Sequence, residues 1–238
     1  MDNFSYNQIV EEFKSLEQLT PKEKYKKLPT IAFHASQALE KSNNLEEIAF
    51  YVSIFKRAGD NRLLNRAKQK EFELKGISEI KTIKTQAKDV QIESGLIGVG
   101  DPTLAHQGDY DQGKIIDLIK TGRFFCVGTG GDGTFGAILR LVDASEPLAN
   151  PKEYKNIISN SSIATIEIKS GNVKCADFFD VGRSDIDSPE LEVPNGFYNV
   201  CFYLKELPKK FFGFVIVLSK TNKINSELSE LKEIETLG

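Results

Sequence analysis

The residues best placed for chemistry form a glycine-rich stretch, TGGDGTFG, at Thr129–Gly136. Glycines let backbone N–H groups approach a ligand closely, and a helix that follows them adds N–H groups and a dipole that favours phosphate. The stretch therefore predicts a phosphate site only if a helix begins near Thr134. The next residues alternate instead, and one face of the strand that they predict carries Phe135, Ala137, Leu139 and Leu141.

The string GGDGT within this stretch resembles the phosphate-binding signature of diacylglycerol, sphingosine and NAD kinases. The resemblance implies a nucleotide-dependent kinase, but the downstream segments that those kinases share are not found. Gly-Gly-Asp-Gly also supplies the positive φ values of a tight turn. We therefore predict an exposed hairpin turn around Asp132, with no helix at Thr134, and keep a GGDGT-type kinase as an alternative.

Histidine and cysteine offer little further chemistry. His106 shares the loop DPTLAHQGDYDQG with Asp101, Asp109 and Asp111, a group that could hold a divalent cation in a metal-dependent hydrolase. Zinc needs three or four N and S ligands and a calcium loop needs a longer series of oxygen ligands, so we expect these aspartates to bond loop backbone instead. His34 is predicted on a helix. Buried strand positions are predicted for Cys126, Cys175 and Cys201. We thus expect no catalytic residue, no metal and no cofactor.

Acidic loops are the most distinctive surface feature of the sequence. The segment Asp177–Glu192, called the acidic segment below, carries six acids against one base, Arg183. Such a run is typical of a solvated loop, and it could also meet a basic partner, where complementary charge speeds association. The candidate partner-binding residues are Asp109, Asp111, Asp180, Asp185, Asp187 and Glu190.

Residues 1–80 predict a helical domain, because apolar residues recur at helical spacing between capping residues. Thr20 and Pro21 begin a short basic helix, KEKYKK, which Pro29 is predicted to end, and Thr30 then caps the next helix. Gly76 ends the last helix. Further helix starts are predicted at Asn3 or Ser5, at Asn44, and at Asp60 or Asn61.

Residues 81–238 predict a mostly antiparallel β-domain, so the fold class is α+β. This half repeats itself: VQIESGLIGVGD at 90–101 matches IEIKSGNVKCAD at 166–177, with Gly171 and Asp177 each 76 positions after Gly95 and Asp101. GRFFCV at 122–127 likewise matches GFYNVC at 196–201, and FGAILRL at 135–141 matches FGFVIVL at 212–218. We predict two four-strand units, 90–141 and 166–218, each a hairpin, an acidic loop and a hairpin. A short terminal helix is predicted in NSELSELKEIETLG.

The composition restricts the partners. A net charge of −3 argues against a nucleic-acid partner, which needs a surplus of Lys and Arg. No apolar run reaches the roughly 18 residues of a membrane span, and MDNFSYNQIVEEF has acids where a signal peptide has basic residues. With three cysteines and no CxxC pair, the chain is predicted to be cytoplasmic, without a membrane partner.

The pattern SG-x-hydrophobic-x-x-x-D, followed by a loop, PNGFYNV and a second strand, resembles β-domains of uncharacterised bacterial proteins often found as immunity proteins of polymorphic or type VI toxin systems. The resemblance covers about residues 88–220, and its carriers are Ser94-Gly95, Asp101, Ser170-Gly171, Asp177 and Pro194–Val200. It implies a non-catalytic protein that binds and neutralises a cognate toxin. The kinase, the hydrolase and a small-ligand-binding β-domain are the alternatives.

Overall fold

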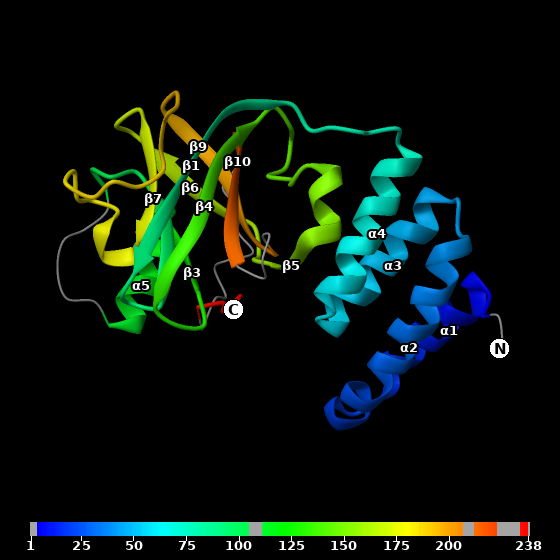
Figure 1. Cartoon of the computed structure of the whole chain (residues 1–238). Helices are drawn as coiled ribbons and strands as arrows, with labels where there is room; N and C mark the ends of the chain where they lie inside the picture. The colour runs from blue at the N-terminus through cyan, green and yellow to red at the C-terminus, as the bar shows by residue number, and fades with distance from the viewer. Residues whose placement is uncertain (1–3, 105–110, 207–211, 223–233, 238) are drawn as a thin grey trace. The chain divides into compact units, whose positions relative to one another are not determined.

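The computed structural model describes residues 4–104, 111–206, 212–222 and 234–237. The chain divides into two compact units, Met1–Glu79 with Pro151–Lys155, and Ile80–Asn150 with Asn156–Gly238. The first unit is helical and the second is a mostly antiparallel β-structure, so the predicted α+β class is confirmed (Figure 1). Among the described residues no helix is long and apolar enough to cross a membrane.

The helical unit is built from four α-helices and two short 3₁₀ helices: α1 Tyr6–Ser15, η1 Leu16–Gln18, α2 Pro21–Lys41, α3 Leu45–Ala58, α4 Asn61–Leu74 and η2 Pro151–Asn156. The helices begin at predicted caps, because the side chains of Ser5, Asn44 and Asp60 accept backbone N–H groups of the first turns. Tyr154 of η2 packs its ring against Phe72 of α4.

Pro29 does not end a helix, contrary to the prediction. Helix α2 runs continuously from Pro21 to Lys41 with Pro29 inside it. Proline removes one backbone hydrogen bond and crowds the carbonyl four residues earlier, which weakens a helix without always breaking it. The second half of α2 buries Ile31, Ala32, Ala35 and Leu39, and this packing stabilises the helix beyond what local propensity predicts.

The β unit contains two sheets. One has the strand order β1-β4-β10-β9-β5 with β6 also paired to β9, and the other has the order β3-β2-β7-β8. The strand β10 runs parallel to β4, and the other pairs that the structure describes are antiparallel. The strands are β1 Thr82–Ile92, β2 Leu96–Gly100, β3 Phe124–Gly128, β4 Gly133–Val142, β5 Ile157–Asn160, β6 Ala164–Ile168, β7 Asn172–Asp177, β8 Glu190–Glu192, β9 Gly196–Glu206 and β10 Phe212–Thr221.

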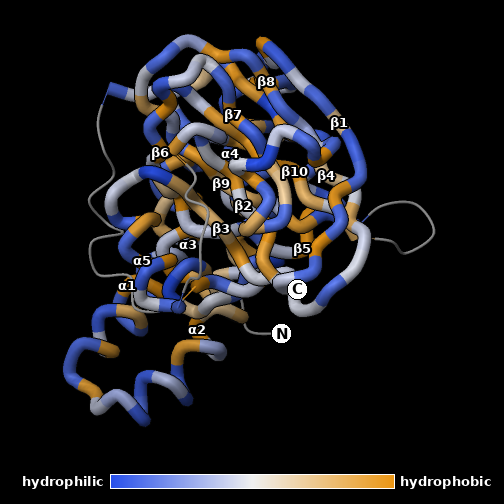
Figure 2. The backbone as a smooth tube through the Cα atoms, turned by 90° about the vertical axis from the view of Figure 1, so that its left-hand side faces the viewer, coloured by the Kyte–Doolittle hydropathy of each residue, from blue (hydrophilic) through white to orange (hydrophobic). Residues whose placement is uncertain are grey.

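One hydrophobic core lies between the two sheets. Apolar residues of both sheets belong to a single buried cluster, with Val90, Leu139 and Ile216 on one side and Val99 and Val127 on the other. The tube view in Figure 2 shows hydrophobic residues concentrated in strands such as β9 and β10. On β4 the expected face, Ala137, Leu139 and Leu141, is buried, and Phe135 packs against the same core. The alternation therefore predicted this strand correctly.

Three of the four predicted hairpins are instead connections between the two sheets, whereas the strands of the fourth, β9 and β10, pair antiparallel as expected. Strand β1 pairs with β4 and not with β2, which pairs with β3 and β7 in the other sheet. The turns at Ser94-Gly95 and Ser170-Gly171, and the stretch between β3 and β4, all cross from one sheet to the other. A hairpin and such a crossing need the same alternation and the same turn residues, so the local sequence does not distinguish them.

Two further segments differ from the prediction. Helix α5, Gln112–Lys120, occupies part of the expected first acidic loop and buries Ile115, Ile116 and Ile119. The predicted terminal helix falls mostly outside the described residues, but residues 234–237 are not helical. Thr236 forms a parallel β-bridge with Gly128 at the edge of β3, and Leu237 packs into the core.

Candidate functional site

Two buried aspartates hold the turns between the sheets. Asp101, fully buried, accepts hydrogen bonds from the N–H groups of Lys169 and Ser170 at 2.6 and 2.7 Å. Asp177, 3% exposed, accepts from the N–H groups of Glu93 and Ser94 at 2.8 and 2.9 Å. The carboxylate of each half of the β unit therefore fixes the turn of the other half. Asp101 bonds loop backbone, as expected, Asp177 does the same, and the role of both is structural.

These reciprocal bonds follow a local twofold symmetry. Val99 and Cys175, which are 76 positions apart, pair directly with each other in the central strands β2 and β7. The second carboxylate oxygen of Asp101 accepts the Thr103 N–H at 2.8 Å, and that of Asp177 accepts the Phe179 N–H at 3.0 Å, again at equivalent positions. The symmetry supports the duplication, which we keep as a proposal.

Strand pairing corrects the second part of the repeat alignment. Strand β3 pairs with β2 as β8 pairs with β7, and the Thr129 and Val193 N–H groups bond Gly95 O and Gly171 O at 2.9 and 2.8 Å. The counterpart of β3 is therefore β8, whereas the sequence alignment matched β3 with β9. Strand β8 escaped the prediction because its three residues, Glu-Leu-Glu, carry only one apolar side chain.

The same correction applies to the last strands. Gly133 opens β4 opposite Ile92, and Gly196 opens β9 opposite Ile168, with φ of 149° and 142°. Strand β4 therefore corresponds to β9, and β10 lies between them as an additional strand. The match of FGAILRL with FGFVIVL reflects two neighbouring parallel strands with the same alternation, and these strands are not equivalents under the twofold symmetry.

The GGDGT stretch lacks the helix that a phosphate site would need. Gly130, Gly131 and Asp132 are exposed, and Thr134 already belongs to strand β4. The expectation that no helix begins at Thr134 is therefore confirmed. The stretch connects two sheets, so the description as a hairpin is wrong.

ATP or NAD is expected to leave the melting temperature unchanged, with or without magnesium, because a ligand that binds only the folded state must raise it. Differential scanning fluorimetry with millimolar nucleotide checks this. The Asp132→Ala variant serves as the control, and a shift that depends on dose and disappears in this variant would restore the kinase interpretation.

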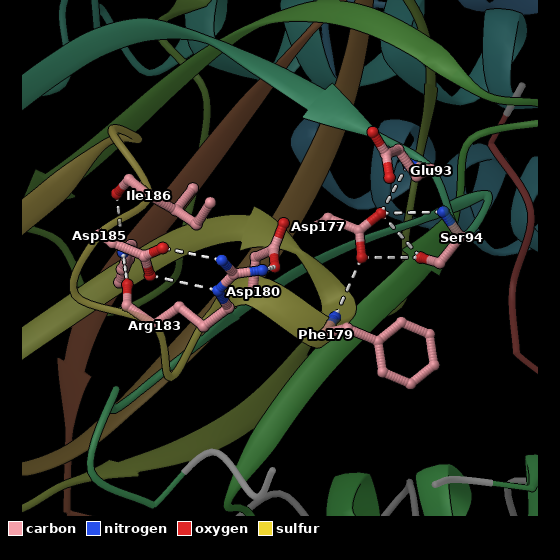
Figure 3. A network of polar contacts seen from close by, with 9 residues as sticks. Glu93, Ser94, Asp177, Phe179, Asp180, Arg183, Asp185 and Ile186 are labelled. Atoms are coloured by element: carbon pink, nitrogen blue, oxygen red, sulfur yellow. Dashed lines mark hydrogen bonds and ion pairs between the residues drawn. The ribbon is translucent and has the colours of Figure 1, made fainter. Parts of the chain in front are cut away.

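A buried lysine on strand β7 holds the middle of the acidic segment. Lys174 lies on β7 and is only 2% exposed, and its ammonium donates hydrogen bonds to the carbonyls of Arg183 and Ile186, the latter at 3.0 Å. Figure 3 shows Arg183 and Ile186, whose carbonyls accept these bonds, together with Asp177, which fixes the start of the segment. Burying a charged ammonium is costly unless it is hydrogen-bonded, so these contacts favour one conformation of the loop.

The exposed side of the acidic segment carries a charged network and, apart from it, an aromatic ring (Figure 3). Arg183 bonds Asp185 at 2.7 and 3.2 Å and Asp180 at 3.2 Å. The hydrogen bonds and charge of Arg183 hold the pKa of the Asp185 carboxyl below its usual range. Phe179 is 45% exposed, while Phe178 is buried and packs edge to face on Phe124. The segment thus exposes an aromatic ring and, separately, a guanidinium paired with carboxylates.

Strand β1 fixes the far end of the acidic segment. Lys84 donates to the Glu192 carbonyl at 2.8 Å, Gln86 accepts the Glu190 N–H, and Lys88 forms an ion pair with Asp187. These three β1 residues alternate along the strand and point to the same side. The acidic segment is therefore fixed at its start, its middle and its end.

The predicted site residues do not form one group. Asp180 and Asp185 share the Arg183 network, whereas Asp187 and Glu190 contact β1. Asp111 is the N-cap of α5, where it accepts the Lys114 N–H at 2.9 Å. Asp109 and His106 lie outside the described residues.

The described histidine and the three cysteines do not form a catalytic group with the acidic residues. His34 bonds Glu12 at 2.9 Å within the helical unit. All three cysteines are buried, and burial raises the pKa of the Cys126 and Cys201 thiols to about 12. Among the described residues no group of three or more His, Cys, Asp or Glu side chains could hold a metal ion. Sequence reasoning missed Lys174 and Phe179, the groups that shape the acidic segment.

A shallow groove of about 350 Å³ lies on the six-stranded sheet, at the parallel contact of β4 and β10. Gly136 and Gly213 lie side by side in its floor, and Asp89 and Lys205 lie in the same row of residues on the flanking strands. Its volume falls within the range of ligand pockets. If the protein were a small-ligand-binding β-domain, this groove would be the candidate binding site.

No family model and no curated protein matches this sequence. Two solved structures show a partial similarity to it. One is ComJ from Bacillus subtilis, described as an inhibitor of the DNA degrading activity of NucA, with 11% identity and a TM-score of 0.40 over 60% of this chain and 98% of that chain. The other is described as crocagin biosynthetic gene J, with 12% identity and a TM-score of 0.45 over 59% of this chain and 100% of that chain.

Proposed function

We propose that this chain is a non-catalytic binding protein whose acidic segment docks onto a basic face of a partner protein. One observation carries the proposal. Lys174, Asp177 and strand β1 fix the backbone of the segment, while Phe179 and the charged side chains remain exposed. A surface that is already ordered loses little conformational entropy when it binds, which favours its use in recognition.

In the acidic segment, different residues are expected to supply the affinity for the partner and the rate of association with it. Aromatic and arginine side chains supply most of the affinity in protein interfaces, so Phe179 and Arg183 are the expected anchors. Asp185 and Asp187 have side chains that are 67% and 86% exposed, which suits them to steer a basic partner during encounter. The partner should therefore present lysines or arginines around an apolar depression.

The finer part of the proposal is that this partner is a cognate toxin, which the protein neutralises by covering its active site or substrate cleft. This part rests on the resemblance to immunity-type β-domains. Co-expression tests it: the toxin, expected from the adjacent gene, should kill cells that lack this protein and spare cells that contain it. Equal killing in both strains would remove the immunity role.

Replacing Asp185 and Asp187 together with Asn is expected to slow association with the partner about tenfold and to flatten its salt dependence. The unfolding free energy should change by less than about 1 kcal/mol, since exposed ion pairs contribute little. Stopped-flow binding at two salt concentrations measures this effect. The matched control, Asp143→Asn with Glu146→Gln, removes the same charge elsewhere on the β unit. Equal association rates for both double variants would contradict the choice of the acidic segment.

A further inference from the structure

The first half of helix α2 extends away from the rest of the helical unit. Figures 1 and 2 both show its N-terminal end projecting beyond α3 and α4. The buried residues of α2, Ile31 to Leu39, all lie in its second half, and residues 21–30 are exposed or half-buried. Leu28 packs against the core of this unit and Lys27 donates to the Ser15 hydroxyl at 2.9 Å, but the exposed side chains of the segment do not contribute to that core and can serve another role.

This projecting segment carries an unusual apolar line. Tyr25 and Phe33 are 84% and 58% exposed, which makes them the two most exposed large hydrophobic side chains of the described residues. Pro29, also exposed, lies midway between them. Residues at i, i+4 and i+8 lie on one face of a helix, so the three side chains form a continuous apolar line about 12 Å long. We call this line, with Lys22 and Lys26, the α2 stripe.

The α2 stripe is positively charged. Residues 21–30 include four lysines and one acid, Glu23. Glu23 is engaged at the helix start, where it accepts hydrogen bonds from the Thr20 N–H and hydroxyl at 2.9 and 2.6 Å. Lys22 and Lys26, one turn apart, lie on the same side of the helix as Pro29 and Phe33, so the apolar line carries ammonium groups near its N-terminal end. The sign is opposite to that of the acidic segment on the β unit, which suggests a separate partner.

We propose that the α2 stripe is a helical recognition element that docks into an apolar groove with an acidic rim on a second protein partner. Tyr25, Pro29 and Phe33 fill the groove, and Lys22 and Lys26 face carboxylates at its edge, which is the usual pattern when an amphipathic helix binds a groove.

The spacing of the rings favours a protein over a single-stranded nucleic acid. Two rings about 12 Å apart along the helix do not match bases that stack about 3.4 Å apart, whereas they match successive anchors of a groove-bound helix. The proposal concerns the helical unit and does not depend on the function proposed for the acidic segment.

The experiment compares full-length baits in extracts of the source cells, with bound proteins quantified by mass spectrometry. The baits are wild type, Tyr25→Ala with Phe33→Ala, and Lys22→Glu with Lys26→Glu. Two control baits change exposed residues elsewhere: Ile83→Ala with Ile158→Ala, and Lys114→Glu with Lys120→Glu. Proteins lost from both stripe variants but kept by both controls are purified and titrated directly, together with a 20-nucleotide single-stranded DNA and vesicles of anionic lipid.

The expected result is an acidic protein whose affinity falls about tenfold or more in each stripe variant and decreases with salt. Far-ultraviolet circular dichroism should show that both variants keep their helices. The proposal is wrong if no retained protein depends on the α2 stripe, or if the purified protein binds all baits equally. Stripe-dependent binding of the DNA or of the vesicles would also overturn it.

Discussion

Replacing Asp177 with Ala is expected to lower the unfolding free energy by about 3 kcal/mol or more. The change removes a buried carboxylate and leaves the N–H groups of Glu93, Ser94 and Phe179 without their acceptor. A loss of this size should lower the melting temperature by about 6–12 °C. Urea unfolding followed by circular dichroism and fluorimetry measure the two quantities.

Because Asp101 is the symmetry equivalent of Asp177, the same substitution can be tested twice in one protein. Asp101→Ala should cost a similar amount, because Asp101 accepts the equivalent N–H groups of Lys169, Ser170 and Thr103. Asp111→Ala is the control, since an exposed N-cap contributes only about 1 kcal/mol. Losses no larger than this control would show that the turns hold without their carboxylates.

The pH dependence of Asp101 has a definite sign. Burial alone would raise the pKa of Asp101, but the hydrogen bonds from Thr103, Ser170 and Lys169 outweigh it and lower the pKa in the folded state. The corresponding stability is therefore fully present above the unfolded pKa of about 3.9 and is lost as the pH falls through the folded value. Wild type should lose more stability than Asp101→Ala between pH 5 and pH 3.

Gly98→Ala is expected to destabilise the β unit by about 3 kcal/mol, which is large for a single added methyl group. A Cβ atom at this central position of β2 would lie 1.9 Å from Cζ of Phe124, whose ring crosses over Gly98. That ring is itself fixed by an edge-to-face contact with Phe178 at 4.9 Å. The ring cannot move aside without losing this contact, and chemical denaturation would detect the strain.

A double variant makes this prediction specific. Adding Phe124→Leu should recover more than about 1 kcal/mol of the Gly98→Ala loss, because residues in direct contact do not contribute additively. Gly131→Ala is the matched control, since nothing lies within 4 Å of its added Cβ and its φ is not positive. If Gly98→Ala and Gly131→Ala were equally stable, the close approach of Phe124 would be disproved.

Local sequence signals predicted the elements better than their partners. The caps Ser5, Asn44 and Asp60 fixed helix starts because a capping side chain acts within its own turn. Pro29 misled the prediction because burial of the second half of α2 stabilises a helix that local propensity would break. Three of the four hairpins were wrong for a related reason, since strands such as β1 and β2 separate into two sheets through contacts far along the chain.

The sequence predicted where the acidic residues of the candidate site are, but not which residues they contact. Counting acids found the acidic segment but did not distinguish Asp185, which is paired with Arg183, from Asp111, which caps a helix. The helix itself had a signal that was overlooked, because Ile115 and Ile119 follow Asp111 at helical spacing. Lys174 had one too: a lysine inside the apolar strand NVKCAD needs a buried partner, which points toward the loop that folds over it.

The exchange of aspartates across the twofold axis bears on how such a chain could have arisen. In a polypeptide with only one half of the β unit, the aspartate would lack the N–H groups that it accepts here, and the turn would lack the carboxylate that accepts its N–H groups. Two copies of that polypeptide would satisfy both needs by pairing their central strands as β2 and β7 pair here. Under the proposed duplication, the ancestor was therefore a symmetric homodimer. Gene fusion then freed each half to change alone, so that one connection became helix α5 and the other became the acidic segment.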